Sequence, residues 1–85
     1  MNTSETSTVL YEVALRIREM RLIAGFTIAE MAQMTDVTPE QYEIYEVGNI
    51  DLPFSFIHKC AIAFNIELTD LLEGRSAHLS SYTVT

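Results

Sequence analysis

The sequence predicts an all-α protein, a compact domain of five helices. Hydrophobic residues make up 48% of the 85-residue chain, which is enough for a buried core. Glycine and proline are scarce, at three and two, and this disfavours a sandwich or barrel with many turns. Helix-capping patterns precede two of the predicted helices. A chain of this length forms one domain at most.

The first helix is predicted from Val9, where a helical period of apolar residues begins. Its core face consists of Val9, Val13, Ile17, Met20 and Ala24. Gly25 follows at the position where a left-handed residue commonly ends a helix. Residues 1–8 are small and polar, so we expect a flexible N-terminal tail there.

Two shorter helices follow, and each begins with a capping pattern. Thr27 and Glu30 have the spacing of a capping box, in which each side chain bonds to the backbone amide of the other residue. This helix ends near Asp36, a residue type that tolerates a left-handed turn. Thr38-Pro39-Glu40-Gln41 predicts a second capping box with proline in its favoured first position, and the third helix runs to Gly48.

The C-terminal part of the chain contains two further helices and a segment of different character. Pro53 opens the fourth helix, whose apolar side consists of Ile57, Cys60, Ala61 and Phe64. Residues 67–73 form the fifth helix, closed by Gly74, so the predicted domain spans residues 9–74. In residues 75–85, Tyr82, Thr83 and Val84 favour a strand. We therefore expect a linker or the start of a missing C-terminal domain there.

The second and third helices, joined at a turn near Asp36, make a helix-turn-helix. Over residues 10–74 the sequence resembles the Cro/repressor-like family, also called the xenobiotic-response-element family. The resemblance is carried by ALRIREMRLIAGFTIAEMAQMTDVTPEQYEIYEVG and CAIAFNIELTDLLEG. The family's small, apolar, core and helix-ending positions match Ala32, Val37, Tyr42, Tyr45, Glu46 and Gly48. The resemblance implies the DNA-binding domain of a bacterial transcription regulator, with the third helix as its reading helix.

The resemblance also implies where double-stranded DNA would be contacted. The matching positions are Thr27, Ile28, Thr38, Pro39, Glu40, Gln41, Glu43, Ile44 and Asn49. Thr38, at a helix N-terminus, could receive a phosphate, although its alternative role is only to cap the helix. Glu43 could accept a hydrogen bond from the amino group of cytosine. The alternative for Glu43 is a solvated face without base contact.

The charge of the chain opposes this function. The formal net charge is −7, whereas nucleic-acid binders are usually basic. No lysine or arginine lies between Arg21 and Lys59, and relatives often carry glutamine where Ile28 stands. The carboxylates in this interval are Glu30, Asp36, Glu40, Glu43, Glu46 and Asp51. We therefore expect the lone domain to bind DNA weakly, and a protein-interaction module that has lost DNA binding is the alternative function.

Two structural expectations concern the first helix. In relatives, an arginine late in this helix pairs with the glutamate that ends the third helix, which implies an ion pair between Arg21 and Glu46. Tyr11, Leu15 and Leu22 lie opposite the core face, where a lone small domain should be polar. These three residues indicate an interface with a second copy or a second domain. Scattered exposed apolar side chains are the alternative explanation.

The remaining patterns bear on the context of the domain. LSSYTVT near the C-terminus resembles the linker and first strand through which many such regulators join a cupin barrel. The resemblance thus implies a longer chain that forms a homodimer. A single cysteine and no signal-peptide pattern fit a cytoplasmic protein without membrane association. The sequence has no catalytic pattern or metal-ligand spacing, so we expect no enzymatic activity, no metal and no cofactor.

Overall fold

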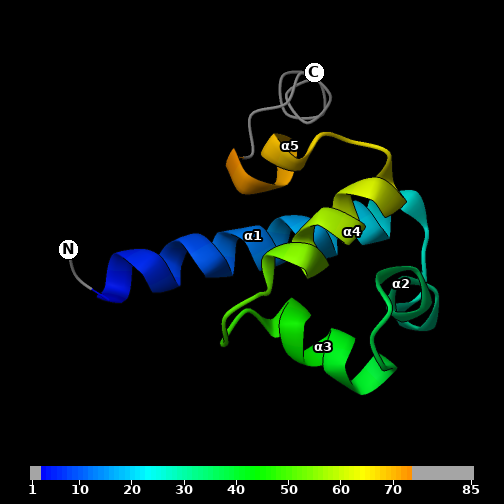
Figure 1. The fold of residues 1–85 in the computed structure, drawn as a ribbon, viewed down its shortest axis with the longest axis horizontal. Helices are drawn as coiled ribbons and strands as arrows, with labels where there is room; N and C mark the ends of the chain where they lie inside the picture. Colours follow the sequence, from blue (N-terminus) through cyan, green and yellow to red (C-terminus); the bar gives the residue numbers. More distant parts are fainter. Residues whose placement is uncertain (1–2, 74–85) are drawn as a thin grey trace.

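The computed structural model describes residues 3–73 as five α-helices, and it describes side chains from residue 11 onward (Figure 1). The helices are α1 (Thr3–Ala24), α2 (Ile28–Thr35), α3 (Pro39–Val47), α4 (Phe54–Phe64) and α5 (Leu68–Glu73). The described part of the chain contains no strand, and the predicted all-α class is confirmed. The expected closing role of Gly74 and the strand expected in residues 75–85 lie outside the described residues.

Helix α1 begins six residues before the start at Val9 that the apolar period predicts. Residues 3–8 contain no apolar side chain, so the apolar period could not indicate where this helix starts. Residues 3–8 contain no glycine or proline to stop the helix. The flexibility predicted for residues 1–8 remains a prediction. At the other end, Ala24 was expected in the core but is exposed, because it lies in the last turn of the helix.

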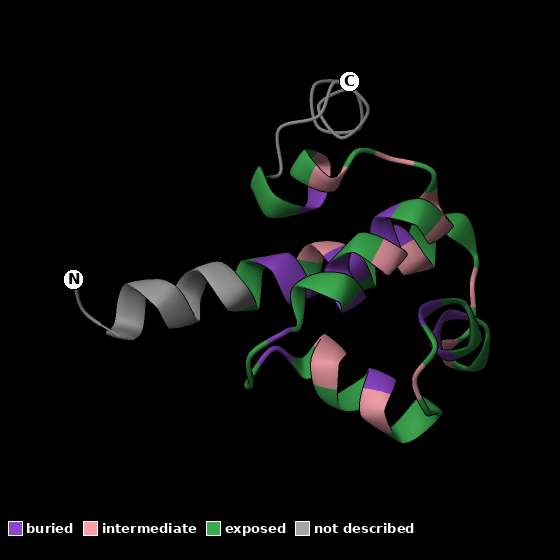
Figure 2. Ribbon diagram, viewed as in Figure 1, coloured by how far each residue is buried: buried purple, intermediate pink, exposed green. Residues whose placement is uncertain are grey.

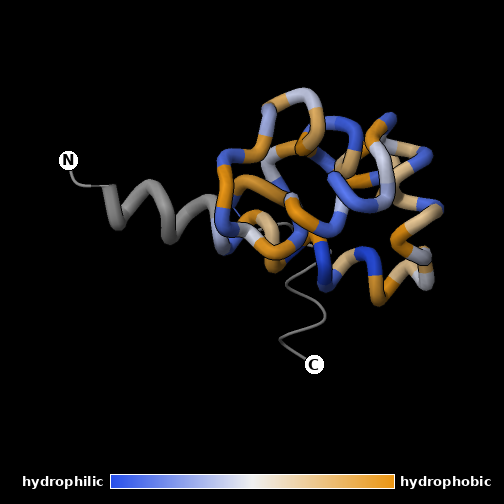
Figure 3. The backbone as a smooth tube through the Cα atoms, turned by 90° about the horizontal axis from the view of Figure 1, so that it is seen from below, coloured by the Kyte–Doolittle hydropathy of each residue, from blue (hydrophilic) through white to orange (hydrophobic). Residues whose placement is uncertain are grey.

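Helices α1 and α4 cross in the middle of the molecule, and α3 and α5 lie on opposite sides of this crossing (Figure 1). Helix α2 packs against both α3 and α4, while α1 also contacts α3 and α5. The buried residues gather where these helices meet (Figure 2). Apolar and polar positions are interleaved along the helices (Figure 3), so that each helix turns an apolar side inward. The fully buried core includes Val13, Ile17, Met31, Tyr42, Cys60 and Leu71.

Local hydrogen bonds and backbone conformation fix both ends of α2 and the start of α3. Both bonds of the capping box are present: Thr27 Oγ1 accepts from the Glu30 amide at 3.0 Å, and Glu30 Oε1 accepts from the Thr27 amide at 2.8 Å. Asp36 is left-handed, with φ 64°, as a residue ending α2 should be. The second predicted box is wrong in part. Thr38 Oγ1 accepts from the Gln41 amide at 3.0 Å, but the half-buried Gln41 side chain makes no return bond.

Gly48 ends α3 and brings it close to α1. Its φ of 84° is left-handed, a conformation that side chains with a Cβ rarely adopt. A Cβ at this position would also lie 3.0 Å from the Cβ of Ala14 and 3.2 Å from Cδ1 of Tyr11. Glycine is therefore favoured here for two reasons, conformation and space, and its small size allows the end of α3 to lie close to α1.

Arg16 connects α1 to the C-terminal end of α5. Its Nη1 donates to the carbonyl oxygens of Leu71 at 2.8 Å and Leu72 at 3.3 Å. The last carbonyls of a helix have no partner within the helix, and a cation there also complements the helix dipole. This contact spans 55 residues of sequence, and no local pattern predicted it.

Candidate nucleic-acid interface

Helix α3 divides sharply into an inner and an outer side. Tyr42 is completely buried, and the ring of the half-buried Tyr45 lies 4.5 Å from that of Phe56. Glu40 and Glu43, one or two positions from these tyrosines in the sequence, are exposed on the opposite side of the helix. Helical spacing sets this division, because residues three or four positions apart lie on the same face. The core fixes the inner side, and the outer side is left free for a ligand.

Arg21 and Glu46, which the resemblance implied as a pair, lie together between α1 and α3. Arg21 Nε donates to Glu46 Oε2 at 2.8 Å, and Nη2 donates to Oε1 at 3.1 Å, so the contact is bidentate. The Tyr42 hydroxyl also donates to Oε2, at 2.5 Å. Arg21 Nη1 reaches the carbonyl oxygen of Phe26 at 3.2 Å. Each charged group of this cluster therefore has hydrogen-bond partners.

Tyr42 is a member of this cluster that the sequence analysis placed only in the core. Its position four residues before Glu46 was the available signal, since such residues are neighbours on a helix. Burial, and then the hydrogen bond to Glu46, raises the pKa of the Tyr42 hydroxyl well above its ordinary value of 10.0. The phenol therefore remains a proton donor to the carboxylate. The hydrogen bond to Glu46 likewise raises the pKa of Arg21.

The residues predicted to contact DNA come from three adjacent segments: the start of α2, α3, and the loop that follows α3. The exposed members are Thr27, Thr38, Pro39, Glu40, Glu43, Ile44 and Asn49. Ile28 and Gln41 are half-buried, and Ile28 also packs against the core. The predicted set therefore consists mainly of accessible side chains.

The electrostatics of this surface are set by carboxylates that lack partners. Glu46 is paired with Arg21, Glu30 bonds to a backbone amide, and Asp36 lies 3.8 Å from Lys59. Glu40, Glu43 and Asp51, in contrast, make no ion pair or hydrogen bond with any described residue. At physiological ionic strength exposed charges act over about 8 Å, so these groups would repel a phosphate that comes close to α3.

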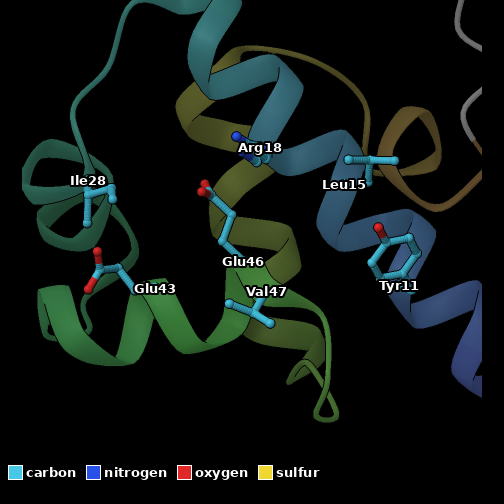
Figure 4. A pocket seen from close by; sticks show the side chains of 7 residues that line it. All are labelled: Tyr11, Leu15, Arg18, Ile28, Glu43, Glu46 and Val47. Atoms are coloured by element: carbon cyan, nitrogen blue, oxygen red, sulfur yellow. The ribbon is translucent and has the colours of Figure 1, made fainter.

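Two of the residues predicted as an interface border a pocket of about 310 Å³ between α1, α2 and α3 (Figure 4). Tyr11 and Leu15 line its α1 side, and Val47 of α3 and Ile28 of α2 add apolar wall. The charged residues of the lining are Arg18, Glu43 and Glu46. Leu22 is exposed but does not line this pocket.

The α3 side of the pocket was not predicted from the sequence. Val47 is 56% exposed, although it stands in the last turn of a helix that is otherwise anchored in the core. The available signal was the spacing of Val47, which stands three positions after the exposed and apolar Ile44 on the same side of the helix.

Within residues 3–73, no helix has the length and apolar character needed to cross a membrane.

Comparisons with known proteins agree with this geometry. A family described as a helix-turn-helix domain matches residues 15–76, which is most of the chain. The match includes α2, α3 and the turn between them. Neither the curated proteins nor the solved structures include a match to the chain. On the family match, the chain belongs to the helix-turn-helix domain family.

Proposed function

We propose that this member of the helix-turn-helix family is the DNA-binding domain of a bacterial transcription regulator, with α3 as the helix that enters the major groove. The observation that carries the proposal is the family match over α2 and α3 together with the exposed outer side of α3. In helix-turn-helix proteins, residues near the N-terminal end of the second helix of the motif contact base edges.

Individual roles follow from the chemistry of the exposed groups. The N-terminus of α3 offers the backbone amide of Glu40 to a phosphate oxygen, because Pro39 has no amide hydrogen and the amides of Gln41 and Tyr42 are bonded to Thr38. Glu43 accepts a hydrogen bond from the amino group of a cytosine, and the apolar Ile44 contacts a thymine methyl group. Asn49 follows α3 in the loop, from which it reaches the DNA backbone.

The isolated domain binds DNA weakly in this proposal, because Glu40 and Glu43 face the phosphates without compensating cations. Useful affinity then depends on dimerisation of a longer chain, since joining two weak sites raises affinity by a factor of about 10² to 10⁴. We assign dimerisation to a C-terminal cupin domain, which the LSSYTVT segment joins to the helices. Reading the coding sequence beyond Thr85 tests this assignment, and a stop codon there would refute it.

The charge argument is tested by titrating a labelled random duplex with the 85-residue chain. We expect a dissociation constant weaker than about 10⁻⁴ M at physiological salt, the weak end of the non-specific range. Glu40→Gln with Glu43→Gln should tighten binding by a factor of about three to ten, because two repulsive charges are removed. Glu19→Gln with Glu67→Gln removes the same charge outside α2 and α3 and should have a smaller effect. Submicromolar binding by the unchanged domain would contradict the argument.

The function itself is tested with the full-length protein and a random pool of DNA duplexes. Repeated selection should enrich a two-fold symmetric site with half-sites separated by about one helical turn, or 10 base pairs. The substitution Glu43→Ala should relax the sequence preference at one base pair per half-site and leave the preference at the other base pairs unchanged. A pool that shows no enrichment after selection by the folded protein would refute a role in DNA recognition.

A further inference from the structure

The outer side of α3 and the neighbouring pocket form one continuous surface with an unusual combination of properties. Ile44 and Val47 are 47% and 56% exposed, and Tyr11 and Leu15 continue the apolar surface across to α1. Unpaired Glu40 and Glu43 flank the apolar side chains of α3. We call the surface formed by Tyr11, Leu15, Ile28, Glu43, Ile44 and Val47 the α1–α3 groove.

From this surface we infer that the α1–α3 groove binds an amphipathic helix of another protein, with the basic flank of that helix turned toward α3. Residues 40, 43, 44 and 47 of α3 lie three or four positions apart, so they form one stripe on its outer side. This is the spacing at which one helix docks along another. The inference goes beyond DNA recognition and does not depend on it.

The distribution of charge selects the occupant. Glu40 and Glu43 lie along the α3 edge and have no ion-pair partner among the described residues. Lysine or arginine side chains of the partner would form ion pairs with these two carboxylates. Arg18, on the α1 wall, is the one cation of the pocket lining and forms no ion pair with a described residue. Arg18 would donate hydrogen bonds to acceptor side chains on the other edge of the partner helix. The partner therefore has a basic edge, an apolar stripe and an acceptor edge.

A second copy of this chain does not fit the same description. Its formal net charge is −7, so two copies repel each other. Among its described cations, Arg16 and Arg21 are already bonded within the domain, Lys59 lies near Asp36, and only Arg18 forms no ion pair. One free arginine on the described helices of a second copy does not make a basic edge that could pair with both Glu40 and Glu43. A heterologous basic helix meets the requirement that a second copy does not.

The test uses the 85-residue chain and a synthetic helical peptide of about 14 residues, roughly four turns, with a leucine stripe flanked by lysine on one edge and glutamate on the other. A peptide of the same composition in scrambled order is the control. The ordered peptide should bind about tenfold more tightly, because only it presents a continuous apolar stripe to the groove. Equal binding of the two peptides would overturn the inference.

Matched variants of the domain locate the binding surface. Glu43→Lys should weaken binding of the ordered peptide about tenfold, whereas Glu67→Lys, which changes the net charge equally on α5, should change it less than about twofold. Val47→Ser should weaken binding, and Ile62→Ser, at a 65% exposed position of α4, should not. Equal loss in the two charge variants would mean general attraction to an acidic protein, and equal loss in the two serine variants would mean general attraction to exposed apolar side chains. Either result would overturn the inference.

Two further measurements keep the result unambiguous. If Glu43→Lys fails to fold, Glu43→Gln must still weaken peptide binding by about threefold, or the inference fails. Self-association of the unchanged chain in sedimentation that Glu43→Lys abolishes would assign the groove to a second copy instead. The random duplex separates this inference from the proposed function, because Glu43→Lys tightens DNA binding while it weakens peptide binding.

Discussion

Glu43 and Glu46 stand one turn apart on α3, and the structure treats them in opposite ways. Glu46 turns toward α1, where it receives three hydrogen bonds from Arg21 and Tyr42. Glu43 faces solvent beside the pocket and bonds to no described residue. The same side chain on the same helix therefore stabilises the fold at one position and is left accessible to a ligand at the other. Charge composition alone does not show which carboxylate does which.

The comparison also explains how a helix with three glutamates can belong to a helix-turn-helix domain. The inner carboxylate is neutralised inside the protein by a cation from α1, so it contributes little field at the outer surface. The outer carboxylates keep their full effect on any approaching phosphate or cation. The fold thus constrains the inner side of α3, and the outer side is free to vary with the ligand.

The largest expected effect comes from breaking the inner pair. Arg21→Met removes the cation from a site where the Arg21 and Glu46 side chains are only 12% and 9% exposed. It should cost about 3–5 kcal/mol of unfolding free energy, because Glu46 is left buried without its counter-ion. Arg18→Met is the control at an exposed position of the same helix and should change stability by less than about 0.5 kcal/mol. Urea denaturation of both variants makes the comparison, and equal stability would contradict it.

A second prediction replaces each of the two carboxylates, in separate variants, by an amide. Glu46→Gln should cost about 1.5–3 kcal/mol, the range for hydrogen bonds to a charged group, because the amide nitrogen cannot accept the bond that Arg21 Nη2 donates to Oε1 and the ion pair is lost. Glu43→Gln should leave stability within about 0.5 kcal/mol of the original chain. Similar losses in the two variants, measured by thermal unfolding, would mean that the division of α3 into inner and outer sides is wrong.

Buried titratable groups of the core should also make the domain sensitive to alkali. Burial, and then the nearby charge of Glu46, raises the pKa of the Cys60 thiol from 9.0 to about 12. Below the pKa of the thiol in the unfolded chain, the stabilisation that comes from this shift is fully present. It is lost as the pH rises toward the pKa of the thiol in the folded domain. Between pH 9.0 and about 12 the unfolding free energy should fall by about 1.4 kcal/mol per pH unit from this group.

The raised pKa of Tyr42 acts in the same direction above pH 10.0 and steepens the loss. Cys60→Ala should remove the thiol contribution and flatten the slope between pH 9.0 and 10.0, even though the smaller side chain lowers stability overall. Denaturation curves at several pH values give the slope directly. An unchanged slope in Cys60→Ala would show that the thiol has no part in it.

The smallest expected effect lies on the outer side of α1. Leu15→Glu with Leu22→Lys should change stability by less than about 1 kcal/mol, because these side chains are 37% and 56% exposed. In the full-length protein the same double variant should loosen packing against a partner if this face is an interface, and sedimentation measures the change. Loss of helicity on substitution would instead place these residues inside the core.

Local signals in the sequence predicted most of the helix boundaries. The Thr27–Glu30 capping box, left-handed Asp36 and Gly48, and Pro53 before α4 each act within one helical turn, so they can be read without the fold. The left-handed Asn65 that ends α4 was missed, although asparagine tolerates this conformation well. The start of α1 was missed because residues 3–8 contain no apolar residue to carry the period back from Val9.

The five helices and the core residues Tyr42 and Cys60 could be predicted from the sequence, and the family pattern added the partners Arg21 and Glu46. Three contacts became visible only in the folded domain: Tyr42 joins this pair, Arg16 reaches the end of α5, and Tyr11 and Leu15 meet Val47 around one pocket. The physical reason is range. Capping and periodicity depend on residues within a few positions, whereas a pocket depends on the angles at which separate helices pack, and those angles are set by the whole core.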